Sequence, residues 1–389
     1  MVRSEQLRGD APEGPVVFVR NRETSERGRE REWCHRTERD EEHQGERIAP
    51  APSLTAWSET FPSLRHLSPD LRSIVIPDEH DGPRGARNLG PPLDQPGLLT
   101  SVHAVIEFSG RDGNRLAADE AGTPGDPPVV LLHGGGQPRH SWGTTLGALA
   151  GKGWHAFAVD LRGHGESEWA ADGDYTLDAF AGDILAISHV LDAPPALVGA
   201  SLGGISSLAA IGEHPGVEVA RALVLVDVAP RMEEQGRMRI GAFMAEHMND
   251  GFASLDEVAD AIQSYNPHRP RPSDLGGLAK NLRHGADGRW YWHWDPAFIG
   301  GKLGGADETR ASLVDPVRLK QAAQGLTLPT LLVRGRVSDL LSEEGAQELL
   351  QLVPHAQMVD VAGAGHMVAG DRNDLFNDAV VNFLDSVHG

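Results

Sequence analysis

The Gly-Ala-Ser-Leu-Gly run at 199–203, centred on Ser201, constrains the fold of this chain more than any other segment. It follows a short apolar run and precedes residues that favour a helix. A strand that turns sharply into a helix strains the backbone at the turn, and glycines two positions before and after the serine relieve the crowding. The serine hydroxyl is then expected at the edge of a sheet, above the first amides of the next helix. Those amides carry partial positive charge that suits an oxyanion.

From about residue 101 onward, apolar runs alternate with segments of helical spacing. The runs that predict buried strands lie at 129–132, 154–160, 196–200, 222–227, 330–334 and 357–361. Helical apolar spacing fills most of the intervals, as at 177–191. Continuous apolar strands separated by helices predict an α/β fold, with a mainly parallel sheet covered by helices on both faces.

Two segments depart from this alternation. Residues 1–98 are rich in charge and proline and bury too little apolar surface to offset the entropy of ordering, so we expect a disordered N-terminal extension with at most a short helix at 63–75. This extension is either a genuine tail or the product of a mis-assigned start. Residues 230–310 hold several helix candidates and no clear strand, which predicts a helical lid inserted between the two parts of the core, 99–229 and 311–389.

A serine hydroxyl needs a base to take its proton and a third group to orient that base. In this topology the acid and then the histidine are expected on loops after late strands. Asp339 follows the run at 330–334, and His366 follows the run at 357–361 within a glycine-rich turn. We therefore predict Ser201, Asp339 and His366 as the catalytic residues. Asp227, at the end of its own strand, is an alternative acid, although capping the entry to the lid is its favoured role.

An oxyanion hole needs two backbone N–H groups. Leu202, the residue after the serine, is expected to supply one of them. The His-Gly-Gly-Gly run at 133–136 follows the first parallel strand, and its glycines let the backbone approach a ligand without side-chain obstruction. Gly135 is the predicted second donor, and Gly136 is the next candidate and a candidate substrate-binding residue.

Three tryptophans alternate in the expected lid, at Trp290, Trp292 and Trp294. Alternating aromatic residues can place one face on the core of the lid and the other toward a substrate. Packing is their favoured role, and substrate binding is the alternative that we retain for all three.

Four motifs in this order resemble those of the α/β-hydrolase superfamily over residues 101–389: 133–136, 160–165, 199–204 and the Gly365-His366 turn. Within the superfamily, the chain is similar to the lid-bearing branch that includes epoxide hydrolases, cofactor-free haloperoxidases, carbon–carbon bond hydrolases and small-ester esterases. Epoxide hydrolases carry an aspartate nucleophile at this turn, and Ser201 departs from them.

The resemblance and the three side chains together imply a serine hydrolase that cleaves a small to medium carboxylic ester through an acyl-enzyme on Ser201. The same residues could instead cleave a carbon–carbon bond of a vinylogous diketone, or perform perhydrolysis. A diketone acid would need a buried arginine, for which Arg283 and Arg289 are candidates. A ligand-binding protein without catalysis is a third reading of the same fold.

Composition narrows the partners of the protein. A net charge of −21 without a stripe of Lys and Arg argues against nucleic acid and anionic membrane surfaces. The single cysteine, Cys34, excludes an intrachain disulfide and a cysteine-based metal site, and no metal or other cofactor is expected. A small-molecule substrate is the expected partner, and a homodimer is compatible with the sequence. No apolar run is long enough to span a membrane and the first 30 residues lack the apolar core of a secretory signal, so a cytoplasmic location is expected.

Overall fold

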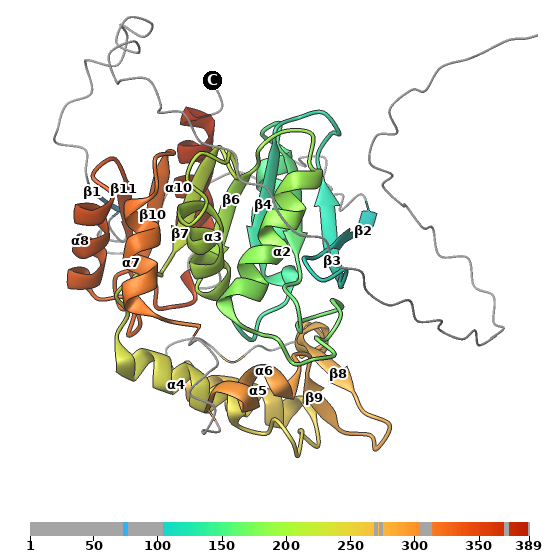
Figure 1. Cartoon of the computed structure of the whole chain (residues 1–389). Helices are drawn as coiled ribbons and strands as arrows, with labels where there is room; N and C mark the ends of the chain where they lie inside the picture. The colour runs from blue at the N-terminus through green and yellow to red at the C-terminus, as the bar shows by residue number, and fades with distance from the viewer. Residues whose placement is uncertain are drawn as a thin grey trace, which may run out of the picture. The chain divides into compact units, whose positions relative to one another are not determined.

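In the part of the chain that the computed structural model describes, nine strands form the central sheet. They are β1 (Ser73–Ile76), β2 (Ala104–Ser109), β3 (Arg115–Ala121), β4 (Pro128–Leu132), β5 (His155–Val159), β6 (Ala196–Ala200), β7 (Ala222–Val226), β10 (Thr330–Gly335) and β11 (Gln357–Val361). Their spatial order is β1-β11-β10-β7-β6-β4-β5-β3-β2 (Figure 1). All neighbours from β1 to β5 in that order pair in parallel, whereas β3 is antiparallel to both β5 and β2. The prediction of a mainly parallel α/β sheet is confirmed.

The structure describes residues 73–76, 104–267, 271, 275–303, 313–368 and 373–387. All of them belong to the compact unit Leu71–Gly389. Within 1–98, only Ser73–Ile76 are described, and they form β1 parallel to β11. The expectation of a disordered extension, and of a helix reaching residue 75, is therefore wrong for these residues, because a Ser-Ile-Val-Ile run has the β-branched side chains that a sheet accommodates. The rest of that segment lies outside the described residues.

Helices cover both faces of the sheet. They are α1 (Gly143–Ala150), α2 (Leu177–Val190), α3 (Leu202–Gly212), α7 (Pro316–Gln324), α8 (Glu343–Leu352) and α10 (Asn373–Ser386). Contacts link α2, α3, α7 and α8 on one face and α1 with α10 on the other. The apolar runs of the sequence follow from this layering, because alternate side chains enter opposite cores. In β4, Val130 and Leu132 pack in one hydrophobic cluster, while Val129 and Leu131 pack in the other.

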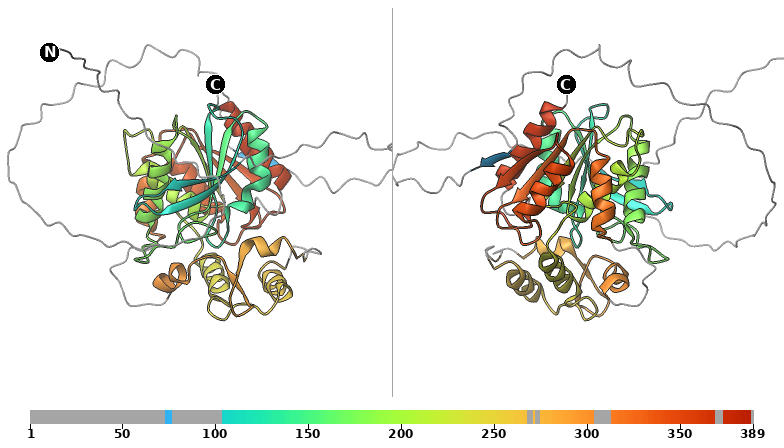
Figure 2. Two further views of the ribbon diagram at one scale, coloured as in Figure 1. Left: turned by 90° about the vertical axis from the view of Figure 1, so that its right-hand side faces the viewer. Right: turned by 60° about the vertical axis from the view of Figure 1, so that its left-hand side comes forward.

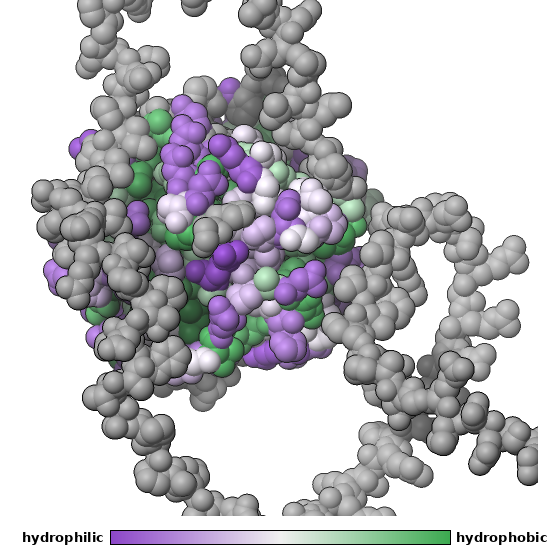
Figure 3. Space-filling model, turned by 90° about the horizontal axis from the view of Figure 1, so that it is seen from above, coloured by the Kyte–Doolittle hydropathy of each residue, from purple (hydrophilic) through white to green (hydrophobic). Residues whose placement is uncertain are grey.

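A separate group of elements lies between β7 and α7. We call its described part, residues 230–267, 271 and 275–303, the insertion. It contains α4 (Glu234–Ala245), α5 (Leu255–Tyr265), α6 (Pro296–Leu303) and the antiparallel hairpin of β8 (Leu282–His284) and β9 (Trp290–Trp292). Figures 1 and 2 show these elements at one end of the sheet. On the opposite end, hydrophilic and hydrophobic residues are interspersed on the surface (Figure 3).

The hairpin corrects the expectation of a purely helical lid. Gly288 has a φ of 80°, and Gly285 donates a hydrogen bond to the carbonyl of Arg289. The tight turn and the aromatic run of β9 favour paired strands over a helix. Among the described residues, no helix is both long enough and apolar enough to cross a membrane.

Candidate active site

Ser201 lies at the sharp turn between β6 and α3. Its φ of 44° and ψ of −108° fall outside the conformations that a non-glycine residue ordinarily adopts. A Cβ atom at Gly199 would lie 2.6 Å from the backbone of Gly203, so a side chain at 199 would block the turn. The Ser201 N–H donates to the carbonyl of Val226 at 3.2 Å, which fixes the turn against the end of β7. The structure thus contains the strained strand-to-helix turn that the sequence predicts.

Asp227 follows β7 and is the carboxylate that contacts His366. The distance from His366 Nδ1 to Asp227 Oδ2 is 2.8 Å. Asp227 is fully buried, and its φ of 50° is a second unusual backbone conformation at this edge of the sheet. Because the Nδ1 side of the imidazole is committed to this bond, Nε2 lies on the opposite side of the ring and is available to another group.

The loop after β10 holds the Asp227 carboxylate in place. The Gly335 N–H donates to Oδ1 at 3.0 Å, and the Ser338 hydroxyl donates to Oδ2 at 2.6 Å. Ser338 Oγ in turn accepts from the N–H groups of Leu340 and Leu341. These two donors face the lone pairs of the hydroxyl oxygen, so the Ser338 proton is directed to Asp227. No motif in the sequence marks Ser338 for this role, because it is an ordinary serine in the loop after β10.

Asp339 is not the partner of His366, and this prediction is wrong. Its side chain is 40% exposed and forms an ion pair with Arg239 of α4, with 2.6 Å between Asp339 Oδ2 and Arg239 Nη1. The role favoured for Asp227, a cap at the entry to the insertion, is also wrong. Its carboxylate instead contacts Gly335, Ser338 and His366. The loops after β7 and after β10 both contact the loop that carries His366. The carboxylate beside His366 is that of Asp227, from the loop after β7.

The His-Gly-Gly-Gly run after β4 passes directly beside Ser201. A Cβ at Gly134 would lie 3.4 Å from the Cβ of Ser201. The Gly134 N–H donates to Gln137 Oε1 at 3.0 Å, and Gln137 Nε2 donates to the sulfur of Met367 at 3.0 Å. Gln137 therefore ties this loop to the residue that follows His366. Leu202 begins α3, so its N–H belongs to the first turn, where helix amides lack acceptors within the helix.

Two buried histidines brace the glycine-rich loops in their neutral form. His133 Nε2 accepts from the N–H of Leu161 at 2.9 Å, so its Nδ1–H donates to the Gly134 carbonyl. Burial lowers the pKa of His133 to about 4. His293, from the insertion, accepts from the N–H of Gly165 at 2.7 Å through Nδ1. Burial, reinforced by the nearby His164 and His133, holds the pKa of His293 well below its usual value.

The three tryptophans of the insertion occupy different positions. Trp294 is buried and its ring edge faces Gly136, where a Cβ would lie 3.3 Å from Trp294 Cζ3. Trp292 is buried beneath it, with ring centroids 4.8 Å apart and an angle of 12° between the rings, and donates to the Glu246 carbonyl. Trp290 pairs through its backbone with Phe252. Of the three, Trp294 is the one placed against the His-Gly-Gly-Gly run.

The sequence of the chain matches the model of the alpha/beta hydrolase family over residues 129–379. The chain belongs to this family. The strained serine turn, the aspartate–histidine pair and the glycine-rich loop beside them therefore sit in an α/β hydrolase, as the resemblance of the four motifs implies.

Individual relatives of this α/β hydrolase match about two thirds of the chain. Esterase Rv0045c of Mycobacterium tuberculosis is 32% identical over 267 residues, which are 67% of this chain and 83% of that protein. The 3-hydroxybutyrate-oligomer hydrolase of Cupriavidus necator is 28% identical, over 65% of this chain and 87% of its own length. A crystal structure of E-2-(acetamidomethylene)succinate hydrolase is similar in fold, with a TM-score of 0.60, 24% identity and coverage of 72% of this chain and 100% of that one.

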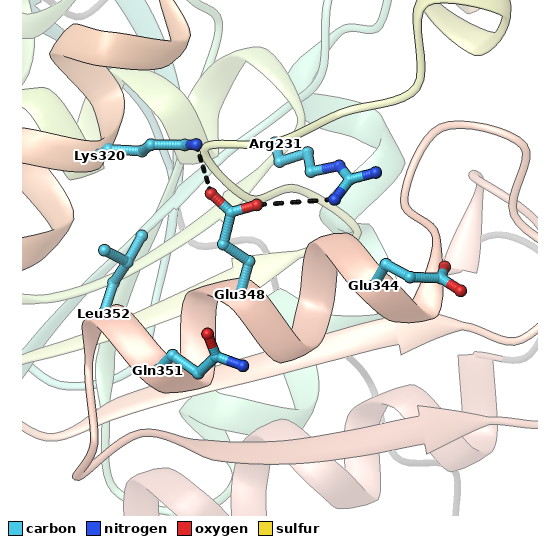
Figure 4. A pocket seen from close by; sticks show the side chains of 6 residues that line it. All are labelled: Arg231, Lys320, Glu344, Glu348, Gln351 and Leu352. Atoms are coloured by element: carbon cyan, nitrogen blue, oxygen red, sulfur yellow. Dashed lines mark ion pairs between the residues drawn. The ribbon is translucent and has the colours of Figure 1, made fainter.

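One pocket of this α/β hydrolase is lined by residues other than those of the serine turn. A pocket of about 480 Å³ is lined by Arg231, Lys320, Glu344, Glu348, Gln351 and Leu352 (Figure 4). Glu348 bridges Lys320 at 2.5 Å and Arg231 at 3.8 Å. Both basic side chains of this pocket pair with Glu348, and the pocket contains none of the residues around the serine turn. Among the described residues, no cluster of three or more His, Cys, Asp or Glu side chains is arranged to hold a metal ion.

Proposed function

We propose that this protein is a serine hydrolase that cleaves a small to medium carboxylic ester through an acyl-enzyme on Ser201. The observation that carries the proposal is the contact of His366 Nδ1 with the buried Asp227 carboxylate, at the end of the strand next to the one that bears Ser201. That arrangement fixes the histidine tautomer in which Nε2 is the free base.

The proposed reaction has two halves. His366 Nε2 takes the Ser201 proton as Oγ attacks the ester carbonyl carbon, and the N–H groups of Gly135 and Leu202 hold the resulting oxyanion. The carbon–oxygen bond to the alcohol then breaks, and His366 returns its proton to the departing oxygen. Water, deprotonated by His366, attacks the acyl-enzyme, releases the carboxylic acid and restores Ser201. Asp227 stabilises the imidazolium in both halves, and Ser338 and Gly335 keep Asp227 in position.

Two kinds of evidence favour ester cleavage over the alternatives. One relative is named an esterase. The two arginines considered for a carboxylated diketone are placed elsewhere: Arg283 lies over the rings of Trp169 and Tyr291, and Arg289 donates to the carbonyls of Asp250 and Gly251. Carbon–carbon bond cleavage with the same triad therefore ranks second, and perhydrolysis is kept as a further alternative. We further propose that the insertion acts as the lid over Ser201. The cytoplasmic location expected from the sequence stays a prediction.

Ester turnover tests this proposal. Wild type should hydrolyse p-nitrophenyl acetate and butyrate, and Ser201→Ala should lower kcat by several orders of magnitude because the nucleophile is lost. Ser264→Ala, an exposed serine on α5, serves as the matched control and should retain wild-type turnover. Equal turnover by wild type and Ser201→Ala would exclude the proposed mechanism.

A further inference from the structure

Met244 of α4 covers the glycine turn next to Ser201. A Cβ at Gly136 would lie 3.1 Å from Met244 Cε and 3.3 Å from its Sδ, and a Cβ at Gly135 would lie 3.9 Å from Sδ. Met244 is 4% exposed, whereas Met238 on the same helix is 57% exposed. The thioether therefore occupies the space that the missing side chains of Gly135 and Gly136 leave open.

Phe298 of α6 covers the same turn from a second helix. A Cβ at Gly135 would lie 3.6 Å from Phe298 Cζ. The Phe298 ring makes edge contacts with His164, Tyr175 and Phe180, at centroid distances of 4.8, 5.8 and 5.9 Å. These contacts on several sides fix its orientation. Met244 differs in having three rotatable bonds and no branching, so its side chain can move without shifting the helix.

The chemistry of the proposed site determines which part of a substrate meets these side chains. The carbonyl oxygen lies at the Gly135 and Leu202 amides, and the departing alcohol oxygen must face His366 to receive its proton. The remaining substituent of the carbonyl carbon is the acyl chain. It is left to the side of the Gly135–Gly136 turn that faces the insertion, where Met244 and Phe298 lie against the positions of the two missing side chains.

We propose that Met244 is the residue that sets the acyl size accepted by this enzyme: its side chain is the movable wall of the acyl site, and Phe298 is the fixed wall. The substrate class is then an ester with a short, apolar acyl chain, and longer chains must displace the thioether. This inference rests on the proposed function, because it takes Ser201 as the nucleophile and the Gly135 amide as an oxyanion donor.

The experiment compares kcat/KM for p-nitrophenyl acetate, butyrate and octanoate. Met244→Ala removes the movable wall and should raise the octanoate-to-acetate ratio by about tenfold or more, the range expected for a few methylene-sized contacts. Met244→Leu keeps the volume but is branched and stiffer, so it should fold and lower the same ratio. Met238→Ala is the matched control on the solvent side of α4 and should leave the ratio unchanged.

The outcomes separate this inference from the function on which it rests. Acetate turnover that persists in both Met244 variants with an unchanged ratio would overturn the role of Met244 and leave the serine hydrolase standing. An equal shift in Met238→Ala, or a shift among alkyl acetates of increasing alcohol length in place of the acyl series, would overturn it as well. Absence of Ser201-dependent acetate turnover in wild type would overturn the proposed function and the acyl wall together.

Discussion

Asp227 combines a strained backbone with a buried charge. A φ of 50° costs a non-glycine residue on the order of 1–3 kcal/mol, and a fully buried carboxylate is costly unless its oxygens are hydrogen-bonded. Three donors meet that requirement: the Gly335 N–H, the Ser338 hydroxyl and the His366 ring. A carboxylate so completely surrounded is held in one orientation, which is what a group that orients a catalytic histidine needs.

The two candidate acids are separated by substitution. Asp227→Asn should lower kcat by about 10³–10⁴-fold, because an amide at this position no longer stabilises the imidazolium or selects its tautomer. Asp339→Asn should change kcat by no more than a few-fold, since an exposed ion pair contributes little. Steady-state ester hydrolysis of the two variants, with thermal unfolding to confirm folding, measures both effects. The reverse order of severity would assign the acid to Asp339.

The residues of the site differ in how clearly the sequence marks them. Glycines two positions from Ser201 and beside His366 mark both as turn residues that face a ligand, and the structure places both at the ends of parallel strands. The acid carries no such mark, because Asp227 and Asp339 each follow a buried strand. Which of the two carboxylates orients His366 depends on tertiary contacts. One of them is the Ser338 hydroxyl, which is 111 positions away in the chain from the Asp227 carboxylate that it binds.

At the scale of elements, residues 293–295 attach the insertion to the loop after β5. His293 accepts from the N–H of Gly165, and the Asp295 N–H donates to the Gly163 carbonyl at 2.8 Å. The Tyr175 hydroxyl donates to Asp295 Oδ2 at 2.5 Å. The Arg-Gly-His-Gly turn thus contacts the insertion on the side next to the His-Gly-Gly-Gly run, which a sequence motif alone does not reveal.

Tyr175→Phe should loosen this attachment. The change leaves a buried carboxylate oxygen of Asp295 without its donor and should cost about 1–3 kcal/mol of unfolding free energy. Because the lost bond joins the insertion to the core, KM should rise and limited proteolysis should cut the insertion sooner. Tyr291→Phe removes a solvent-exposed bond to Asp287 within the hairpin and is the matched control. Equal effects of the two changes would argue against a specific attachment at Tyr175.

In the insertion, the spacing of apolar residues predicts the helices but not the two short strands. Helices at 234–245 and 255–265 lie in the segment for which helices are expected, but β8 and β9 have only three residues each, too few to show a repeat. Met244 and Phe298 look like ordinary apolar helix residues in the sequence. Their position over Gly135 and Gly136 follows from how two helices dock, which is a tertiary property.

At the scale of the whole molecule, the buried histidines make stability depend on pH. An unfolded histidine binds a proton near pH 6.5, whereas native His133 does so only near pH 4. The stability from keeping it neutral is complete above pH 6.5 and is lost as the pH falls toward 4. The free energy of unfolding should drop by about 2 kcal/mol between pH 8 and pH 5 from His133 alone. His293 acts in the same direction.

Urea unfolding at pH 8 and pH 5 measures this dependence. His293→Gln, which keeps an acceptor for the Gly165 N–H, should shrink the difference between the two pH values because one buried histidine no longer titrates. His189→Gln, at an exposed position on α2, should leave the difference as in wild type. A pH dependence that His293→Gln leaves intact would contradict the account.

The layered core was the most predictable part of the whole molecule. Strands such as β4 and β7, buried along their full length, can exist only between two layers, so a run of consecutive apolar residues already implies helices on both faces. The edge strand β1 was not predictable in the same way. Four residues inside a proline-rich and charged segment carry too little pattern, and their partner among the described strands is β11, which is distant in the sequence.

The most direct test of the central claim is the intact mass of the protein after reaction with a fluorophosphonate probe. We expect that wild type gains one adduct, that peptide mapping locates it on Ser201, and that Ser201→Ala gains none under the same conditions. An adduct on Ser201→Ala, or on a different residue of the wild type, would contradict Ser201 as the activated nucleophile.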